Sequence, residues 1–410
     1  MSNKGSESVI TPAVFVQGGS GLSRNSILSF IRASGTLTDA QFALATWKFI
    51  SQHNQHYCYA GAPGDNFNYT NDPLRLLHGY GFTCCDQSTD ILVWLWQGAG
   101  YQARAASMTF HEVPEIFYSG AWHMYDADHK VYYLEKDNKT VASVADIIAD
   151  SSLVAREADT DGNDPVGYSG QWMADQYSAA TPTYEYNTFS DETDFSLRSS
   201  QTFMLRSYNA TTNIFHGAYS GAEPLASDAV NSGQFDWELD FARPDWQNLT
   251  IVSKGVEALS SGTDTFLTNS STSSGFVIYY LSSPFPLFSL AVSGTVYLQD
   301  ATASINAYVL HGDSSWSTAF PMSAKAGAPV QTTADLTSAA LGQYSYFLIL
   351  RLSGSAPNAA RIGAVHITSE VQVAKILFPN LVPGAINHLT YQDWSPTTIP
   401  HDVEISVAVR

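Results

Sequence analysis

Three residues in the first half of the chain have the types and the order that a nucleophilic thiol site requires. Cys85 stands just before an apolar run, His111 follows it, and Asp126 lies further along. A thiolate is a nucleophile, an imidazole within reach can take the thiol proton, and a carboxylate can fix the imidazole tautomer. These residues are therefore candidates for a site with a nucleophilic thiol.

The position of Cys85 allows two interpretations. A helix is predicted to begin at Cys85 and to stop near Gly98 and Gly100, with Thr83 and Asp86 at capping-box spacing. A thiol in the first helical turn feels the positive end of the helix dipole, which lowers its pKa. A buried, inert cysteine that packs on a sheet fits the same position equally well.

A β-hairpin is predicted to bring the other two residues together. Its turn falls at Ser119-Gly120, so that positions 111–113 lie opposite 126–128, and His111 and Asp126 become neighbours. The short β-like runs around this hairpin are 101–110, 115–118, 121–126 and 130–134.

Helical periodicity indicates two further helices in this half. One covers about 38–53, where Thr38 and Gln41 form a predicted capping box. A shorter helix is predicted within 141–155, and 159–170 is predicted to be a loop. From about residue 200 onward, strand-like runs and turns dominate. We therefore predict an α+β fold, with one domain over 1–200 and one or two antiparallel β-sandwich modules over 201–410.

The order of these features resembles that of the transglutaminase-like superfamily, a branch of the papain-like cysteine enzymes. In that family the nucleophilic cysteine begins a helix, a glycine and an arginine follow its end, and histidine and aspartate lie on the next two strands. The matching residues here are Cys85, Gly100, Arg104, His111 and Asp126, the last after Gly-Ala-Trp at 120–122. The resemblance covers residues 35–140.

This resemblance implies acyl transfer or hydrolysis of an amide through a thioester, and a role for each residue. Cys85 is expected to be the nucleophile, His111 the general base and then acid, and Asp126 the group that orients His111. Backbone amides at the helix start are expected to bind the oxyanion, together with Tyr80, although packing is the plainer role for one of 22 tyrosines. The expected substrate-binding residues are His78, Tyr80, Arg104, Tyr118 and Trp122.

Two other classes of function fit the same sequence. Histidines, tyrosines and arginines crowd the segment from His53 to Tyr125, and these are the types that a lyase acting on uronic-acid glycans needs as base, acid and carboxylate partner. The β-rich second half also fits a non-catalytic glycan-binding or cell-surface protein. The expected partner is thus a peptide, an isopeptide or a polysaccharide, and the β modules allow a homo-oligomer.

Charge and composition narrow the choice of partner and compartment. The 19 basic and 38 acidic residues give a net charge of −19, which repels phosphate backbones and anionic lipid surfaces. No nucleic acid or membrane partner is therefore expected. Charged residues make up only 14% of the chain, a composition that favours a secreted or periplasmic protein, although the opening residues show no signal-peptide pattern.

The cysteines and histidines predict neither a disulfide framework nor a metal centre. Adjacent cysteines seldom bridge each other, and Cys84 points about 100° away from Cys85 around the helix, where it is predicted to pack. The alternative role for Cys84 is that of a resolving thiol. Neither CxxC nor HExxH occurs, the acidic loop 159–164 lacks the spacing of a calcium loop, and no cofactor is expected.

Overall fold

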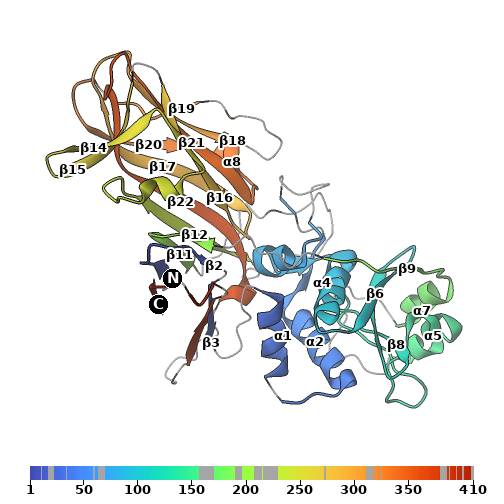
Figure 1. Cartoon of the computed structure of the whole chain (residues 1–410). Coiled ribbons are helices and arrows are strands. Elements are labelled where there is room, and N and C mark those ends of the chain that lie inside the picture. The colour runs from blue at the N-terminus through green and yellow to red at the C-terminus, as the bar shows by residue number, and fades with distance from the viewer. Residues whose placement is uncertain are drawn as a thin grey trace.

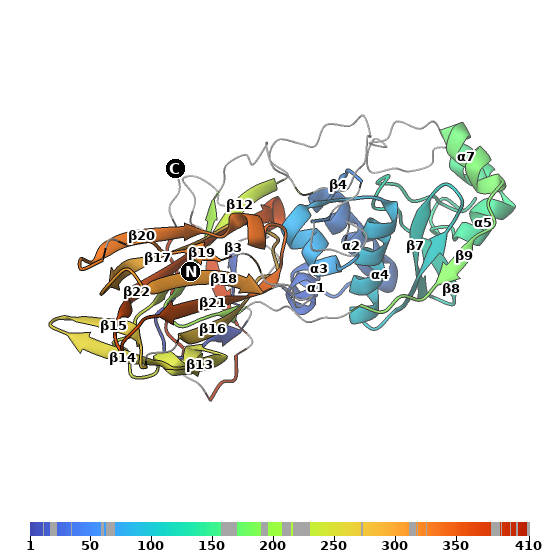
Figure 2. The same cartoon turned by 90° about the horizontal axis from the view of Figure 1, so that it is seen from above.

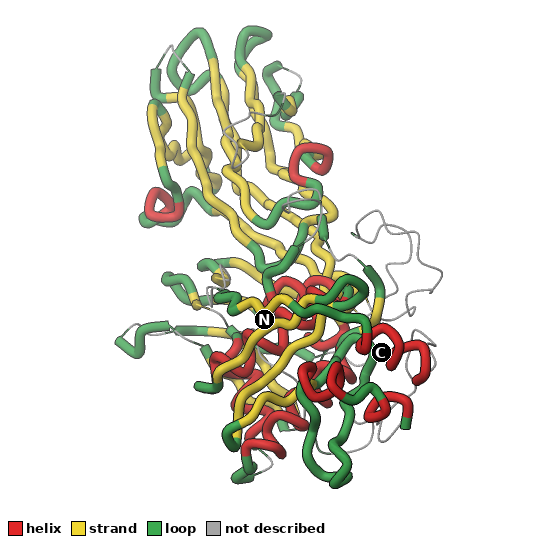
Figure 3. Tube along the Cα trace, turned by 90° about the vertical axis from the view of Figure 1, so that its right-hand side faces the viewer, coloured by secondary structure: helices red, strands yellow, loops and turns green. Residues whose placement is uncertain are grey.

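The computed structural model places helices and strands in two parts of the molecule (Figure 1). It describes residues 1–410 except 11, 17–22, 34, 59–60, 63–69, 157–169, 190–195, 207–214, 216–229, 272–273, 311–316, 318, 325, 379–385, 387, 394, 399–400 and 408–410. Most helices gather in one part, whereas the long strands of the second half fill the other (Figure 3). The α+β class is confirmed, and the acidic loop 159–164 lies outside the described residues.

Helix α4 (Cys85–Gly98) is the centre of the first part. It is buried from Gln87 to Trp96, because helices cover one side of it and a sheet covers the other. The helix predicted over about 38–53 is confirmed as α2 (Asp39–His53), with Thr38 and Gln41 forming the capping box. The remaining helical elements of this part are α1 (Arg24–Arg32), α3 (Pro73–Arg75), the π-helical turn η2 (Leu76–Tyr80), α5 (Val144–Ala149), α6 (Ser152–Ala155) and α7 (Gly170–Ser178).

An antiparallel sheet with the order β8-β7-β6-β9 packs against α4. Its strands are β6 (Gln102–Ser107), β7 (Glu112–Tyr118), β8 (Ala121–Met124) and β9 (Thr183–Glu185). The predicted hairpin between β7 and β8 is confirmed, with Tyr118 opposite Ala121. Helices α5 to α7 share a second core with the other face of this sheet, so the sheet is covered on both sides.

Two local predictions differ from the structure. The cap of α4 is Cys84, and its box partner is Gln87 rather than the predicted Thr83 and Asp86 pair. The run 130–134 makes only isolated bridges, through Val131 and Leu134, and no strand. Here the chain turns back immediately after Asp126, which leaves too few residues for a continuous ladder.

Cys84 is part of a disulfide with Cys58, and does not merely pack. The short parallel pair β4 (Gln55–His56) and β5 (Phe82–Thr83) sets His56 beside Thr83, and the Tyr57 N–H donates to the Thr83 carbonyl. This pairing brings two segments that are distant in sequence to the start of α4. Cys85 is the cysteine that remains free.

The second part consists of two antiparallel sheets that pack face to face around one core. The larger sheet contains β14 (Val256–Ser261), β15 (Asp264–Asn269), β22 (Ala360–Ala374), β12 (Val230–Leu239), β11 (Gln201–Arg206), β1 (Ser2–Asn3), β24 (Val403–Glu404), β17 (Leu287–Leu298) and β20 (Val330–Asp335). The smaller sheet contains β13 (Val252–Lys254), β16 (Gly275–Ser282), β21 (Ser345–Ser353), β18 (Ser304–Leu310) and β19 (Phe320–Pro321). The shorter elements are β2 (Val9–Ile10), β3 (Ala13–Val16), β10 (Ser196–Leu197), β23 (Leu389–Gln392), α8 (Thr337–Ala340), η3 (Trp246–Leu249) and η4 (Lys375–Leu377).

The first residues of the chain lie with this β part, and not with the helices. Strand β1 pairs with both β11 and β24, so assigning all of 1–200 to the helical domain misplaces these residues. Figure 2 shows the two parts end to end. The turn η2 of the helical part contacts β22 and η4. Here the Tyr80 hydroxyl lies 2.7 Å from that of Tyr344, and Gln372 Nε2 donates to the Gly79 carbonyl over 2.9 Å.

Candidate functional site

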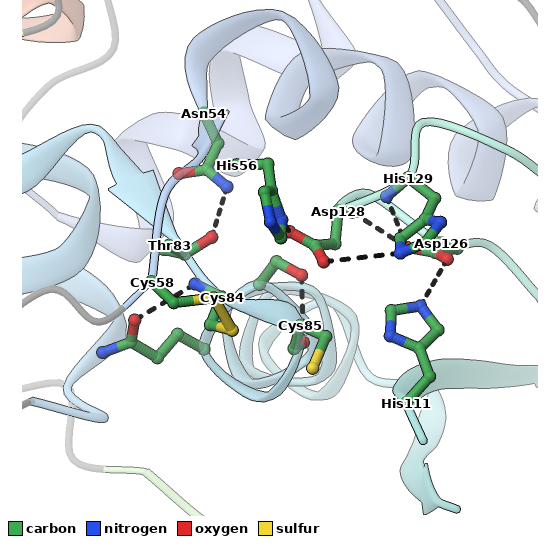
Figure 4. A network of polar contacts seen from close by, with 12 residues as sticks. Asn54, His56, Cys58, Thr83, Cys84, Cys85, His111, Asp126, Asp128 and His129 are labelled. Carbon is green, nitrogen blue, oxygen red and sulfur yellow. Dashed lines mark hydrogen bonds and ion pairs between the residues drawn. A yellow bond between two sulfur atoms is a disulfide. The ribbon is translucent and has the colours of Figure 1, made fainter. Parts of the chain in front are cut away.

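The thiol of Cys85 and the imidazole of His111 lie together at the start of α4 (Figure 4). Cys85 Sγ, a ring nitrogen of His111 and a carboxylate oxygen of Asp128 are all within 4.8 Å of one another. His111 Nε2 lies 2.7 Å from Asp126 Oδ2. Since Nε2 is held by this carboxylate, Nδ1 is the nitrogen available to the thiol.

Asp126 is held rigidly by the tight turn that follows β8. Its Oδ1 accepts the backbone N–H groups of Asp128 and His129 over 2.9 and 3.0 Å. Its own carbonyl accepts the Trp47 indole N–H over 2.7 Å. Two backbone N–H groups and the His111 ring thus hold the carboxyl group of Asp126, and the Trp47 indole holds its backbone carbonyl. This rigidity also sets the orientation of the His111 ring.

A second histidine and carboxylate pair adjoins the first, and sequence reasoning did not anticipate it. His56 Nδ1 lies 2.8 Å from Asp128 Oδ1. The ring of His129 packs on that of His111, with centroids 4.3 Å apart. The only signal in the sequence was the run Asp126-Ala-Asp-His directly after a predicted strand. His56 comes from β4, and only the tertiary fold brings it here.

The surroundings of Cys85 favour the protonated thiol. Burial raises the pKa of the Cys85 thiol far above its ordinary value, and the Asp128 carboxylate raises it further, against a backbone hydrogen bond at Glu112. The predicted lowering of the thiol pKa by the helix dipole is therefore outweighed. A proton acceptor is needed at the moment of attack, and His111 occupies that position.

The pKa of the Asp126 carboxyl group is shifted in the opposite direction to that of the Cys85 thiol. Burial acts to raise its pKa, but His111, His129 and the hydrogen bonds that it accepts outweigh burial, so the pKa of Asp126 is lowered. Asp126 is therefore ionised at neutral pH, although it is 1% exposed. An ionised carboxylate at this distance favours a proton on His111 Nε2 and stabilises the imidazolium that forms when His111 accepts a second proton.

Two of the expected substrate-binding residues, Arg104 and Trp122, lie on the face of the sheet that points away from α4. Ala103 of β6 belongs to the core that contains α4, and successive strand residues point to opposite faces, so Arg104 points away from α4. Arg104 makes two contacts with Glu115, at 2.7 and 2.8 Å, and its guanidinium lies 3.9 Å from the Trp122 ring centroid. Arg104 and Trp122 thus form a structural cluster under α5.

The other expected binding residues also point elsewhere. Tyr118 is at the far end of β7, seven residues from His111, and its hydroxyl contacts that of Tyr125 at 3.0 Å. His78 and Tyr80 are fully buried in η2, at the contact with the β part. The Tyr80 hydroxyl is engaged by Tyr344, which leaves packing between the two parts as its observed role rather than oxyanion binding.

Comparisons with known proteins return only remote structural similarity. No protein-family model matches the sequence, and no curated protein is similar to it. A family 6 carbohydrate-binding module from Clostridium cellulolyticum in complex with xylose matches with 7% identity and a TM-score of 0.24, covering 31% of this chain and 93% of that one. A family 35 module from Clostridium thermocellum matches with 8% identity and a TM-score of 0.22, covering 28% and 89%. A xylan-binding family 15 module matches with 13% identity and a TM-score of 0.22, covering 32% and 95%.

The α+β class with antiparallel sheets stands on the structure itself. Among the described residues, no helix has both the length and the apolar character needed to span a membrane.

Proposed function

We propose that this protein is a cysteine-dependent hydrolase or acyltransferase that acts on amide bonds. One observation carries the proposal: the free thiol of Cys85 lies within 4.8 Å of a His111 ring nitrogen, and Asp126 holds the other ring nitrogen at 2.7 Å. A nucleophile, a base and an orienting carboxylate in this order are the parts that thioester chemistry requires. The transglutaminase-like resemblance of residues 35–140 agrees with this proposal.

The proposed reaction follows from these contacts. His111 Nδ1 takes the Cys85 proton as the sulfur attacks the carbonyl carbon of the amide. The resulting imidazolium is stabilised by Asp126 and then donates its proton to the leaving amine as the carbon–nitrogen bond breaks. A thioester on Cys85 remains. Water releases an acid from this thioester, whereas a second amine releases a new amide, and in either case Cys85 regains its proton.

The test compares wild type with Cys85→Ala and with His366→Gln, an exposed histidine of β22 that serves as a matched control. Each protein is incubated with glutamine-containing peptides and isopeptides, with and without a fluorescent primary amine, and amine release and intact mass are followed. We expect turnover and an acyl adduct on wild type and on the control, and neither on Cys85→Ala. Turnover that survives in Cys85→Ala contradicts the proposal.

The same samples test the lyase alternative. Uronic-acid polysaccharides are added, and near-ultraviolet absorbance is followed for unsaturated products. A rise in absorbance that persists in Cys85→Ala supports elimination by the histidines and tyrosines of the first part, and rules against the thiol mechanism as the main activity.

A second proposed function, glycan binding by the β part, is favoured by one specific surface. On the outer face of the smaller sheet, Tyr280 is paired with Phe347, with ring centroids 5.1 Å apart, and Phe347 is paired with Leu310. All three are partly exposed. The neighbouring row across the same sheet consists of Val252, Ile278, Ile349 and Tyr308.

Apolar and aromatic rows on an outward sheet face are unusual unless they bind something, and flat aromatic rings stack on the apolar faces of sugars. We expect Tyr280→Ala and Phe347→Ala to weaken retention on polysaccharide gels at least about tenfold. Tyr297→Ala, on β17 of the other sheet, serves as the control. Equal retention of all three variants contradicts glycan binding at this face.

A further inference from the structure

The donor groups around Cys85 also match those of a zinc site. Sulfur, imidazole nitrogen and carboxylate oxygen are provided by Cys85, His111 and Asp128, with these atoms all within 4.8 Å of one another. Ligand atoms of a tetrahedral zinc ion lie about 3.3–3.8 Å apart. Side-chain rotations that move the three donor atoms by about 1 Å therefore bring them to bonding distance from one ion. We propose that these three residues bind a single Zn²⁺ ion at the thiol.

The groups behind these ligands are placed as in metal centres. His111 directs Nε2 to Asp126, which leaves Nδ1 for a metal, and His56 holds Asp128 through Oδ1. Histidine ligands that are oriented by a carboxylate, and carboxylate ligands that are themselves hydrogen-bonded, are the usual outer shell of such sites. In the proposed site His111 would therefore bind the ion, and His56 would orient the Asp128 ligand.

The local charge also favours a cation. The charged groups that act on the Cys85 thiol are the carboxylates of Asp86, Asp126 and Asp128. A carboxylate oxygen of Asp86 lies within 4.8 Å of Cys85 Sγ, and among the described residues Asp86 Oδ1 is buried without a hydrogen-bond partner. A divalent ion would compensate this concentration of negative charge, and a water molecule would supply the fourth ligand of a tetrahedral ion.

The mixed donor set selects the metal. Thiolate and imidazole favour zinc and its neighbours, whereas magnesium and calcium prefer oxygen ligands alone. On binding, Zn²⁺ forms a bond to sulfur and the thiol proton leaves to solvent. Metal binding itself is independent of the proposed activity. If Cys85 is also the nucleophile, as proposed above, the zinc form is a resting state in which the thiol cannot attack.

The first test uses chelator-treated full-length protein and Co²⁺ as a spectroscopic substitute for Zn²⁺. We expect one equivalent of Co²⁺ to give a thiolate-to-cobalt charge-transfer band in the near ultraviolet, and one equivalent of Zn²⁺ to abolish it. Zn²⁺ should also protect Cys85 from alkylation, as read by intact mass. A stoichiometric Co²⁺ complex without the thiolate band, or no binding at all, overturns the inference.

Variants identify the ligands, with circular dichroism confirming that each is folded. Cys85→Ser and Asp128→Asn should weaken Zn²⁺ binding at least about 100-fold, and His56→Gln about 10–100-fold, whereas His366→Gln should leave it unchanged. Unchanged affinity in Cys85→Ser means that zinc binds elsewhere. Turnover that depends on Cys85 without any cobalt band would refute only the zinc site, whereas a cobalt band without turnover would refute only the proposed enzyme.

Discussion

At the scale of residues, the protonation state of the Cys85 thiol decides how the site reacts. Burial and neighbouring carboxylates raise the pKa of Cys85, so the thiol is protonated at rest and depends on His111 for activation. This differs from a thiol that is permanently ionised by a helix dipole. The difference is measurable, because alkylating agents react with the thiolate only.

We predict that metal-free protein is alkylated slowly by iodoacetamide at neutral pH, and that the rate rises continuously up to at least about pH 9. A raised thiol pKa leaves little thiolate below that pH. The modified residue is identified by peptide mass, with Cys85→Ala as the blank. A rate that reaches its plateau below about pH 7 contradicts the raised pKa.

A second residue-scale prediction concerns Asp90, which is buried in α4. Burial raises the pKa of Asp90 to about 8, against a hydrogen bond from Asn187. The folded state therefore holds this proton more tightly than the unfolded state, whose pKa is near 3.8, and Asp90 lowers stability progressively as pH rises from about 4 to about 8.

Asp90→Asn removes this titration. We expect the variant to gain stability relative to wild type as pH rises from about 5 to about 8, with the difference constant above that range. Urea unfolding at several pH values measures the difference. Asp264→Asn, an exposed residue of β15, is the control. A difference between Asp90→Asn and wild type that does not change with pH contradicts the raised pKa.

At the scale of elements, the disulfide between Cys58 and Cys84 ties β4 to the start of α4. It thereby places His56 near Asp128 and fixes the helix that carries Cys85. The disulfide closes a loop with a sequence separation of 26, for which chain entropy gives a stabilisation of about 3–4 kcal/mol.

We predict that replacing Cys58 and Cys84 together by alanine lowers the free energy of unfolding by about 3 kcal/mol. Reduction of wild type should have a similar effect. Denaturant unfolding measures both, and Cys85→Ala controls for the loss of a cysteine as such. Peptide mapping should find Cys58 linked to Cys84, and a Cys85 that is open to alkylation. Equal stability of the double variant and wild type rules out a stabilising disulfide.

At the scale of the whole molecule, the β part and the thiol site are joined through η2. Tyr344 of the β part contacts the Tyr80 hydroxyl and lies under the Arg75 guanidinium, 3.9 Å from ring centroid to Arg75 Cζ. Five residues after Tyr80 the chain reaches Cys85. The contact of Tyr344 with Tyr80 therefore supports the segment that leads from η2 to Cys85.

We predict that Tyr344→Ala lowers the free energy of unfolding by about 3–5 kcal/mol. It leaves a cavity at the contact and removes the partner of the Tyr80 hydroxyl. Calorimetry should show the helical part unfolding at a lower temperature than the β part, so that one transition becomes two. Tyr297→Ala, away from this contact, should preserve the shape of the transition. An unchanged single transition in Tyr344→Ala contradicts coupling between the parts.

The sequence by itself determined the elements whose signals are local. Capping residues and apolar period defined α2, the start of α4 followed from its residue pattern, and the turn at Ser119-Gly120 predicted the hairpin of β7 and β8. This hairpin and the tight turn after it bring His111 and Asp126 together, so their contact was also predictable. The role of these residues in a reaction stays a prediction.

The tertiary structure alone decided the rest, because those features depend on contacts between distant segments. The pairing of β4 with β5 placed Cys58 beside Cys84, where they form the disulfide, and placed His56 beside Asp128. Because successive residues of a strand point to opposite faces of the sheet, Arg104 and Trp122 point away from the thiol. Packing against the β part buries His78 and Tyr80. Burial also reversed the expected pKa shift of Cys85. A residue's type and spacing can suggest its chemistry, but its exposure and neighbours are set only when the chain has folded.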